Sequence, residues 1–323
     1  MNRKVLFNTW TGAFFNPGGG EVQLLQTRLH LQKAGAQVSL FDLWKPQHDF
    51  EIFHQFSIQA GVEYPMREYR QLGKKIALSP ILWTDFLQKD AFYYRIRELF
   101  ELSDILLTNS DAESKKLAHD FELDLRKFHK TRNGISEDFL DTCTDKDFRT
   151  QFKLPDEFIL SVANIDRRKN TLSLIQACAE IGKTLVLIGH IRDPIYFQEC
   201  RNKNSDFLFL GPITDVSVLK SAFQQCSIYA LPSLCETPGI AALEAASQGA
   251  KVVITREGPT EEYFGNLVTY VDPLDLTSIR DGINKELKAT RNKDQLISHI
   301  VSHYTWDKTA EDVLNGYQKI LTL

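Results

Sequence analysis

Residues 229–255 decide the fold, and they read YALPSLCETPGIAALEAASQGAKVVIT. The apolar run 228–231 predicts a buried strand, and the alanine-rich segment after the turn predicts a helix that ends at Gly249. A second apolar and β-branched run at 252–255 predicts another buried strand. A strand, a helix and a strand in close succession are typical of a parallel α/β sheet.

Two glutamates flank the predicted start of this helix. Glu236 lies in the turn before it and Glu244 lies within it, with seven residues between them. Backbone N–H groups at a helix start bind anions, helped by the helix dipole. Pro238 has no N–H group, so Gly239, Ile240 and Ala241 would supply the donors. A phosphate site flanked by carboxylates that accept hydrogen bonds from sugar hydroxyls indicates a nucleotide-sugar site, and two solvated charges are the alternative.

The same stretch carries a family resemblance. The E-x7-E spacing is followed by Ala245-x-x-x-Gly249 and a β-branched strand. This order resembles the donor-binding segment of the retaining family 4 glycosyltransferases, the glycosyl transferases group 1. The resemblance implies the GT-B fold, an α/β architecture of two Rossmann-like, doubly wound parallel-sheet domains that face a cleft. It also implies transfer of a sugar from a nucleotide-diphosphate sugar to a hydroxyl acceptor with retention, by double displacement or by same-face attack.

The length of the chain suits two domains. At about 100–200 residues per domain, 323 residues can form two separate cores. We expect an N-terminal, acceptor-side domain at 1–140 and a C-terminal, nucleotide-sugar-binding domain at 141–305, connected by the polar segment 136–150. Residues 306–323 predict a last helix with an apolar stripe, and the resemblance implies that it crosses back to the first domain.

Composition argues against several other classes. An apolar content of 43% and a charged content of 25% are those of a globular protein. The net charge of −4 argues against a nucleic-acid partner, although a local patch can still bind a membrane surface weakly. Five cysteines without a Cys-x-x-Cys pair indicate a reducing compartment. We therefore expect a cytoplasmic protein, with contact to the inner face of the membrane as an option.

Three glycines mark the first turn of the N-terminal domain. Gly18, Gly19 and Gly20 lie between a predicted strand and a predicted helix. Glycines there let a ligand approach the backbone and leave helix N–H groups for an anion. The resemblance directs them towards the donor phosphates or the acceptor, and a flexible turn is the alternative. On the helix that follows, the predicted apolar side consists of Val22, Leu25, Leu29 and Leu31.

Two further features of this domain bear on the substrate. His54 lies near the C-terminal end of the predicted strand 51–56, where open α/β sheets bind ligands. By resemblance it would reach the transferred sugar, and a hydrogen-bonded structural histidine is the alternative. Residues 79–100 are rich in aromatic and basic side chains. They favour an acceptor site, a membrane-surface helix or, as the simplest alternative, a helix that packs its aromatic residues into its own domain.

A basic cluster follows the first predicted strand of the second domain. Arg167, Arg168 and Lys169 come after the strand 158–163 and before a helix. Such cations suit a diphosphate, because arginine binds phosphate through a planar fork and lysine as a point charge. A solvated turn is the alternative. The family usually has Gly-Arg, a gap and Lys-Gly here, so Lys169 carries over while Asn164 stands at the arginine position. Arg167 or Arg168 would then take the place of that arginine.

The resemblance implies a role for each site residue. Glu236 would accept hydrogen bonds from the donor sugar near its anomeric carbon, Lys169 would hold the diphosphate, and His54 would close the site. Glu244 would bind the ribose hydroxyls, and Ile213 would bind the base through its backbone. The other expected members of the donor site are Gly18, Gly19, Gly20, Asn164, Arg167, Arg168, Gly239 and Ile240.

The sequence favours a hexosyl transfer without a metal. The pattern Asp-x-Asp at 145–147 lies in the predicted linker, so we expect no metal, and no cofactor beyond the nucleotide-diphosphate sugar as co-substrate. The acceptor would be a glycan or a lipid-linked saccharide of a surface polysaccharide pathway. Two other classes stay open. One is a catalytically impaired GT-B homologue that binds a sugar nucleotide or acts as a scaffold. The other is a different GT-B enzyme, such as a nucleotide-sugar epimerase or, against the length of the chain, a phosphorylase-like enzyme.

Overall fold

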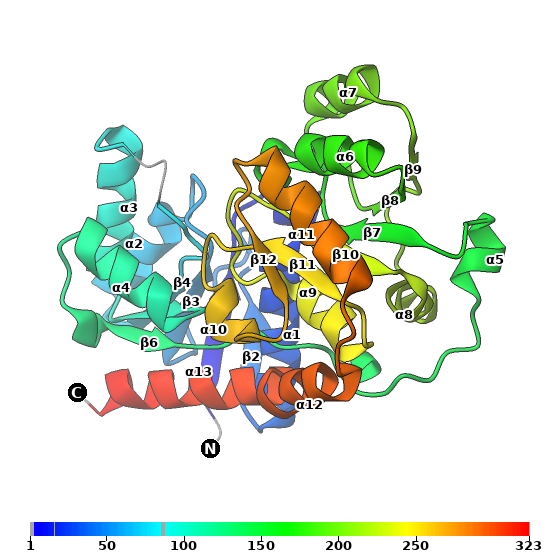
Figure 1. The fold of residues 1–323 in the computed structure, drawn as a ribbon. Helices are drawn as coiled ribbons and strands as arrows, with labels where there is room; N and C mark the ends of the chain where they lie inside the picture. The colour runs from blue at the N-terminus through cyan, green and yellow to red at the C-terminus, as the bar shows by residue number, and fades with distance from the viewer. Residues whose placement is uncertain (1–2, 16, 85–87, 323) are drawn as a thin grey trace. The chain divides into compact units, whose positions relative to one another are not determined.

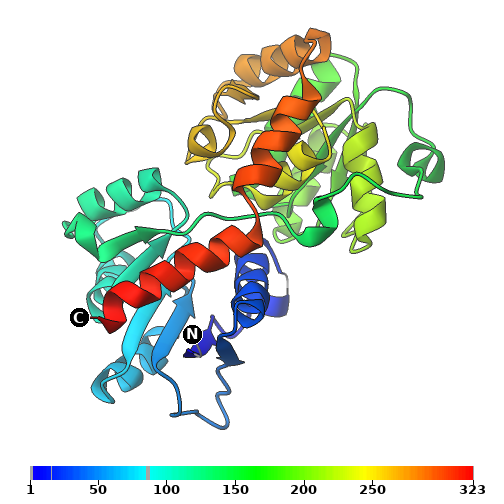
Figure 2. The same ribbon diagram turned by 90° about the horizontal axis from the view of Figure 1, so that it is seen from below.

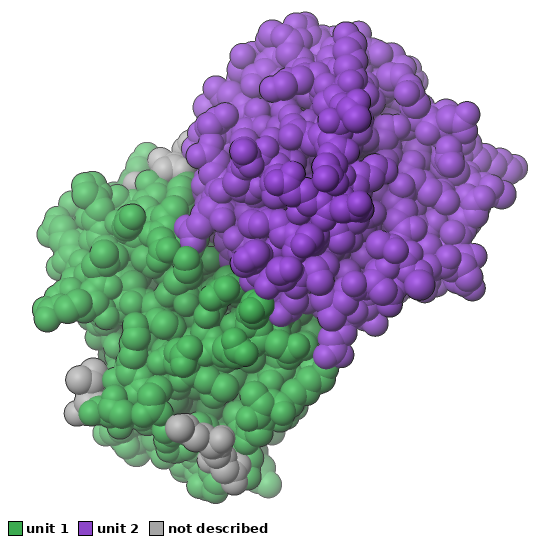
Figure 3. Space-filling view, turned by 60° about the horizontal axis from the view of Figure 1, so that its bottom comes forward, with its two compact units in different colours: residues 1–134, 306–323 green, residues 135–305 purple. Residues whose placement is uncertain are grey.

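Two six-stranded parallel sheets organise the chain (Figure 1). The structure is a computed structural model that describes residues 3–15, 17–84 and 88–322. The chain divides into two compact units, drawn in different colours in Figure 3. Unit 1 comprises residues 1–134 and 306–323, and unit 2 comprises the residues between them. The predicted fold class, two Rossmann-like parallel-sheet domains, is confirmed.

Unit 1 has the strand order β2-β1-β3-β4-β5-β6, and every neighbouring pair is parallel. Its strands are β1 (Lys4–Asn8), β2 (Gln37–Leu40), β3 (Ile52–Phe56), β4 (Lys75–Ser79), β5 (Ile105–Thr108) and β6 (Phe128–Lys130). Its helices are α1 (Gly19–Lys33), α2 (Glu63–Gln71), α3 (Ala91–Leu102), α4 (Asp111–Asp120) and α13 (Trp306–Leu321), with the short 3-10 turns η1 (Ala13–Phe15) and η2 (Leu125–Lys127). Parallel pairing requires crossover connections, which bring helices onto both faces of the sheet.

Helices cover both faces of this sheet, because alternate residues of a strand point to opposite sides. In β1, Leu6 packs with side chains of α2, α3 and α4. Val5 and Phe7 pack with side chains of α1 and α13 on the other face (Figure 2). The apolar stripe predicted for the last helix is thus buried in unit 1. The last helix therefore completes the core of a sheet formed by the first 130 residues.

The predicted apolar side of α1 is wrong for three of its four residues. Leu31 is buried, but Val22, Leu25 and Leu29 are 37%, 44% and 45% exposed. The buried side of α1 instead carries polar groups with partners. The Gln23 side chain donates to Asn109 Oδ1 at 2.9 Å, and His30 Nδ1 lies 2.6 Å from Asp307 Oδ1 of α13. The orientation of this helix is therefore set by the burial of Leu24 and Leu31 together with hydrogen bonds to neighbouring elements.

Of the aromatic segment 79–100, the structure describes the end of β4, residues 80–84 and 88–90 and most of α3, and residues 85–87 lie outside the described residues. Tyr93 and Phe100 are buried, and the Tyr93 ring stacks on Phe121 with centroids 4.7 Å apart. Phe92 and Tyr94 are 41% and 61% exposed. The segment thus packs part of its aromatic surface into unit 1 and leaves part at the surface. Within the described residues, no helix has the length and apolar content needed to cross a bilayer.

Unit 2 has the strand order β12-β11-β10-β7-β8-β9, again all parallel. Its strands are β7 (Phe158–Val162), β8 (Thr184–Ile188), β9 (Phe207–Phe209), β10 (Ile228–Leu231), β11 (Val252–Thr255) and β12 (Thr269–Val271). Its helices are α5 (Phe148–Phe152), α6 (Thr171–Glu180), α7 (Pro194–Lys203), α8 (Val216–Gln225), α9 (Ile240–Ser247), α10 (Thr260–Phe264), α11 (Leu276–Lys288) and α12 (Lys293–His303), with the 3-10 turns η3 (Glu137–Phe139) and η4 (Arg167–Lys169).

The strand order of unit 2 identifies where a ligand would bind. Counted from its first strand, the order is that of a Rossmann sheet, and the chain direction across the sheet reverses between β7 and β10. At such a point the loops that leave the two strands diverge and open a crevice at their carboxyl ends. The loop after β7 carries the basic cluster, and the loop after β10 carries Glu236. Topology therefore brings these two predicted segments together.

Both faces of the second sheet are also filled. Side chains of α8, α9 and α12 pack on one face and those of α6, α7 and α11 on the other. The alanines of α9 let this helix lie close to the sheet, since Ala242, Ala245 and Ala246 are fully buried. Close packing of α9 fixes the position of its first turn relative to β10. The predicted strands at 228–231 and 252–255 are confirmed residue for residue.

Candidate functional site

The candidate site of unit 2 is centred on Glu236, a carboxylate that is only 3% exposed. Its Oε1 accepts hydrogen bonds from Lys169 Nζ and from Ser233 Oγ, both at 2.5 Å. Arg168 Nη1 lies 3.9 Å from the same oxygen. Burial alone would raise the pKa of Glu236, but the Lys169 and Arg168 cations hold this pKa below its usual value. The group is therefore a buried anion, and its Oε2 makes no hydrogen bond with the described residues.

The turn before α9 has a conformation that requires glycine. Gly239 has a φ of +90°, and a Cβ built there would lie 3.1 Å from Leu231 Cδ2 and 3.4 Å from Glu236 Oε2. Gly258 has a φ of +98°, and a Cβ there would lie 2.2 Å from the carbonyl oxygen of Glu236. A side chain at either position would displace the Glu236 turn. Glycine at 239 and 258 thus lets three backbone segments meet around this carboxylate.

The first turn of α9 offers backbone donors beside Glu236. The N–H groups of Ala242 and Leu243 bond to Gly239 O within the helix. Those of Gly239 and Ile240 make no backbone hydrogen bond within the described chain. Because α9 begins at Ile240, the positive end of its dipole points to the same place. The predicted anion-binding turn therefore has the geometry expected of it.

The structure distinguishes the two arginines that the sequence left as alternatives. Arg168 lies next to Glu236, and its Nη1 also donates to Cys235 O at 3.2 Å. Arg167 points towards α7 instead, where its Nη2 donates to Glu199 Oε1 at 2.6 Å and its guanidinium covers the Tyr196 ring. Arg168 therefore adds positive charge to the site, and Arg167 is engaged elsewhere.

Asn170 connects the two loops, a role that sequence reasoning missed. Its side-chain amide donates to Pro232 O at 3.1 Å and to Pro273 O at 2.8 Å, and its φ of +54° suits asparagine in a left-handed turn. The Leu234 N–H also donates to Arg168 O at 2.8 Å. These bonds hold the basic turn η4 against the loop after β10. An asparagine directly before a predicted helix was the available signal.

Glu244 differs from Glu236 in its surroundings. It is half-buried on the second turn of α9, and its carboxyl makes no hydrogen bond with the residues that the structure describes. Burial raises the pKa of Glu244 to about 8. Because the two carboxyl groups have pKa values shifted in opposite directions, they suit different roles. Burial removes water from the Glu244 carboxyl, so a ligand that donates hydrogen bonds to it would replace the lost hydration.

Two other predicted members of the donor site lie at the carboxyl ends of neighbouring strands. Asn164 follows β7, and its Oδ1 accepts from the His190 N–H at 3.4 Å in the loop after β8. Ile213 lies in the loop after β9, where its side chain packs against the core. No described residue bonds to the backbone N–H of Ile213. Asn164 is therefore held by the next loop, whereas the Ile213 backbone can bind a ligand.

In unit 1, the three glycines form the start of α1. Gly19 and Gly20 are its first two residues, and the N–H of the preceding Gly18 donates to Glu21 Oε2 at 2.7 Å. The Glu21 carboxylate thus accepts the hydrogen bond of the Gly18 N–H, the first donor at this helix end. The N–H groups of Gly19 and Gly20 have no acceptor in the described part of unit 1. They are the donors that this loop offers.

His54 lies elsewhere than its predicted place. It is the third of the five residues of β3 and is fully buried. Its Nδ1 lies 2.6 Å from Tyr317 Oη of α13, and its Nε2 lies 2.9 Å from Ser79 Oγ of β4. Burial lowers the pKa of His54 to about 3, so the ring is neutral. These contacts fit the structural alternative and leave neither ring nitrogen available to a sugar.

Comparison with known families assigns most of unit 2. Residues 144–300 match the family described as glycosyl transferases group 1. This segment belongs to that family. The E-x7-E pair, the basic turn and both loops of the candidate site lie inside it. The resemblance inferred from Glu236 and Glu244 is thereby confirmed.

Curated relatives of the group 1 segment are glycosyltransferases. The serotype-specific mannosyltransferase WbdA of Escherichia coli is 23% identical over 249 residues, which are 71% of this chain and 30% of WbdA. An uncharacterized glycosyltransferase of Methanocaldococcus jannaschii, MJ1607, is 26% identical over 189 residues, 53% of this chain and 47% of that protein. The chain spans less than half the length of either relative.

Solved structures share the fold over nearly the whole chain. Sucrose-phosphate synthase from Thermosynechococcus elongatus has a TM-score of 0.81 at 18% identity, covering 99% of this chain and 100% of that one. Anabaena HepE in complex with UDP has a TM-score of 0.79 at 16% identity, covering 98% and 100%. At these identities the likeness establishes the fold alone. The predicted GT-B fold is confirmed.

Proposed function

We propose that the chain transfers a hexosyl group from a nucleoside-diphosphate sugar to a hydroxyl acceptor with retention of anomeric configuration. The observation that carries this proposal is Glu236, an anion buried between Lys169, Ser233 and the start of α9. It lies where the chain direction across the sheet reverses, between β7 and β10. HepE, a structure of the same fold, was solved with UDP, which supports a nucleotide donor. WbdA is a mannosyltransferase, which supports a hexosyl group.

Positive charge and backbone donors would bind the donor diphosphate without a metal. The Lys169 ammonium has three N–H donors and gives one to Glu236, which leaves two for phosphate oxygens. Arg168 adds a second cation, which compensates for Asn164 at the usual arginine position. The N–H groups of Gly239 and Ile240 complete the site. Together they would stabilise negative charge as the bond between the anomeric carbon and the diphosphate oxygen breaks.

Glu236 would act on the donor sugar. Its Oε1 is fully used by Lys169 and Ser233, so Oε2 is the atom that faces a ligand. A fixed carboxylate accepts hydrogen bonds from sugar hydroxyls and stabilises positive charge at the anomeric carbon. The acceptor hydroxyl would form the new bond to that carbon, and the nucleoside diphosphate would leave with the electron pair of the broken bond. The hydroxyl proton would pass to the departing diphosphate oxygen.

Glu244 and Ile213 would bind the nucleoside. A carboxylate can accept two hydrogen bonds from the neighbouring ribose hydroxyls, and Glu244 has no competing partner in the described structure. The Ile213 backbone would bind the base. Recognition by backbone groups gives no side-chain signal for the base, so the proposal extends to nucleoside diphosphates as a class.

The acceptor would be a glycan or a lipid-linked saccharide of a surface polysaccharide, handled on the inner face of the membrane. WbdA is described as serotype-specific, which supports a surface glycan. Exposed Phe92 and Tyr94 of α3 give unit 1 aromatic surface for a saccharide or for weak contact with a bilayer. The arginines of the same helix are paired, Arg95 with Glu63 and Arg97 with Glu101, which favours the saccharide.

The test is the variant Glu236→Gln, which keeps the size of the side chain and removes its charge. We expect transfer to fall about 100-fold or more, because the positive charge of the transition state loses its partner. Donor binding, measured by thermal shift across a panel of nucleoside-diphosphate sugars, should persist. The matched control is Glu257→Gln, an exposed neighbour whose side chain makes no hydrogen bond or ion pair with the described residues. Transfer by Glu236→Gln at the rate of that control would refute the assignment.

A second candidate function is donor binding without transfer, and Asn164 at the family's arginine position favours it. The two functions differ in one measurement. A transferase consumes donor only when a suitable acceptor is present, and NMR of the product reports an anomeric centre of unchanged configuration. A binding homologue is stabilised by the donor but leaves it intact with every acceptor.

A further inference from the structure

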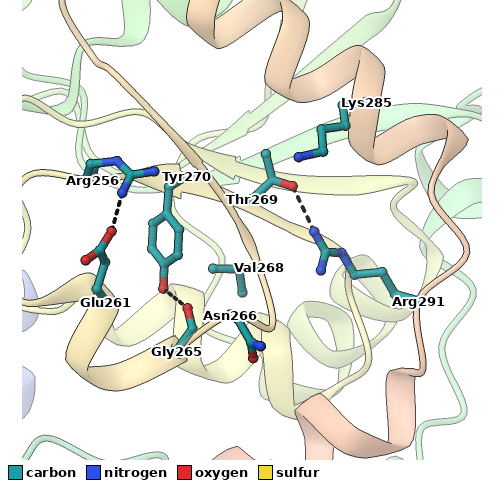
Figure 4. A pocket seen from close by; sticks show the side chains of 9 residues that line it. All are labelled: Arg256, Glu261, Gly265, Asn266, Val268, Thr269, Tyr270, Lys285 and Arg291. Carbon is teal, nitrogen blue, oxygen red and sulfur yellow. Dashed lines mark hydrogen bonds and ion pairs between the residues drawn. The ribbon is translucent and has the colours of Figure 1, made fainter.

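A cavity of about 720 Å³ lies in unit 2 away from the candidate donor site. It follows the edge strand β12, which β11 separates from β10 and its Glu236 loop. Figure 4 shows its lining from β12, from the turn after α10, from α11 and from the segment before α12. The residues of its wall are Arg256, Glu261, Gly265, Asn266, Val268, Thr269, Tyr270, Lys285 and Arg291. Its wall contains no residue of the loops after β7 and β10, although Arg256 begins the loop after β11, in which the Glu257 carbonyl accepts the Glu236 N–H.

One side of this cavity is already neutral. Arg256 forms an ion pair with Glu261 and lies over the Tyr270 ring, 5.4 Å from its centroid. The Tyr270 hydroxyl donates to Gly265 O at 2.7 Å (Figure 4). The ring is thereby fixed, and the polar groups around it are paired. This side offers a wall of fixed shape rather than a charge.

The other side holds a guanidinium with unused donors. Arg291 Nε and Nη2 donate to the two oxygens of the fully buried Glu286 at 2.6 and 2.8 Å, and Nη2 also donates to Thr269 Oγ1 at 2.9 Å. Three of its five N–H donors are thus hydrogen-bonded to Glu286 and Thr269. Nη1 makes no hydrogen bond with the described residues, and Arg291 lines the cavity. A bidentate pair holds the remaining donors in one orientation before any ligand arrives.

Lys285 gives one side of the cavity its net positive charge. It is exposed on α11, and no acidic side chain of the described structure pairs with it. In Figure 4 its side chain extends towards Thr269, on the same side of the cavity as Arg291. The wall carries three basic residues and one acidic residue, and the buried Glu286 neutralises Arg291. The side of Lys285 and Arg291 is therefore left with one net positive charge and oriented donors.

We propose that this cavity binds an anionic monosaccharide unit, a sugar that carries a phosphate or a carboxylate. Lys285 and Arg291 Nη1 bind the anion, since both present N–H donors without a protein acceptor. The exposed Asn266 amide bonds to ring hydroxyls, and Val268 contacts the apolar edge of the sugar. The volume exceeds that needed for a single phosphate and falls within the range of small-molecule sites. The site is separate from the proposed donor site and does not depend on it.

The test measures binding of glucose 6-phosphate, glucuronate and neutral glucose to the full chain by NMR or calorimetry. We expect the two anionic sugars to bind and glucose to bind much more weakly. In Lys285→Gln both anionic sugars should bind about tenfold more weakly, the loss of a hydrogen bond to a charged group. A phosphate ligand and a uronic acid ligand are distinguished by which of the two probes binds more tightly.

The control variant is Lys288→Gln, which removes an exposed and unpaired lysine from the same helix. It should bind both probes as the native chain does. Lys169→Met separates this cavity from the proposed donor site, and binding should persist in it. Equal affinity in Lys285→Gln and Lys288→Gln, binding lost in Lys169→Met, or no difference between the anionic sugars and glucose would each overturn the proposal.

Discussion

At the scale of single residues, the candidate site is defined by two glutamates in opposite electrostatic environments. Glu236 faces Lys169 and Arg168, so it is ionised, with its pKa held below the usual value. Glu244 has no charged partner, and burial raises its pKa to about 8. The first group can therefore act as a permanent anion. The second holds a proton near neutrality and can lose it when a ligand supplies hydrogen-bond donors.

Glu244 should make both stability and donor binding depend on pH. Its pKa is raised from an ordinary 4.5 to about 8, so the unfolded chain releases this proton at lower pH than the folded chain. The folded state is therefore penalised progressively between about pH 4.5 and pH 8. We expect Glu244→Gln to raise the melting temperature at pH 8.5 by about 2–4 °C, for a gain on the order of 1 kcal/mol, and to have no such effect at pH 4.5.

Donor binding should show the opposite trend. Ribose hydroxyls favour the ionised carboxylate, so affinity for a nucleoside-diphosphate sugar should increase as the pH rises from 6 to about 8. Titrations of the donor at several pH values measure this increase. In Glu244→Gln the affinity should be lower and independent of pH over the same range. A pH profile that Glu244→Gln leaves unchanged would exclude this glutamate as its source.

At the scale of elements, the basic turn η4 and the loop after β10 behave as one structure. Asn170 bonds to the carbonyl groups of Pro232 and Pro273, and Leu234 bonds to the backbone of η4. Hydrogen bonds therefore orient Arg168 towards Glu236, while Glu199 and Tyr196 draw Arg167 towards α7. Neighbouring arginines in one short turn have different partners because consecutive side chains point in different directions.

A series of three variants tests this difference. We expect donor affinity to fall most in Lys169→Met, by about tenfold or more, because this ammonium would bind both Glu236 and the diphosphate. Arg168→Met should reduce affinity by less, since its side chain is 46% exposed and its attraction is screened. Arg167→Met is the matched control and should bind donor as the native chain does. Calorimetric titration gives all three values. A loss in Arg167→Met equal to that in Lys169→Met would contradict the geometry.

At the scale of the whole molecule, each unit has its own core on both faces of its sheet, and α13 belongs to the core of unit 1. His54 of β3 and Tyr317 of α13 are joined by a buried hydrogen bond of 2.6 Å. This contact connects residues 263 positions apart in the chain. It gives the fully buried imidazole of His54 a hydrogen-bond partner inside unit 1.

Removing that hydrogen bond should destabilise unit 1 and spare the donor site. In Tyr317→Phe the buried Nδ1 of His54 loses its partner, which we expect to cost about 1–3 kcal/mol. Denaturant unfolding of the variant measures this cost. Stabilisation by nucleoside-diphosphate sugars should persist, because Glu236, Lys169 and Glu244 all lie in unit 2. An unchanged unfolding free energy would show that this contact is not formed in solution.

The sequence alone predicted the elements whose hydrophobic pattern is compatible with only one secondary structure and one buried position. The strands at 228–231 and 252–255 are apolar throughout, so they can only be buried, and the alanine-rich helix between them has to lie against the sheet. The E-x7-E spacing also led to the family match of residues 144–300, whereas the donor site that it implies stays a prediction. The stripe of the last helix was equally clear.

Tertiary structure decided everything that depends on a partner distant in sequence. Val22, Leu25 and Leu29 are exposed because α1 turns Leu24 and Leu31 to the core. On the same side Gln23 and His30 have partners, Asn109 and Asp307, that no local pattern reveals. The roles of His54, Arg167 and Arg168 were undecided for the same reason. A polar side chain takes its function from the group it meets, and that group is fixed only when the chain has folded.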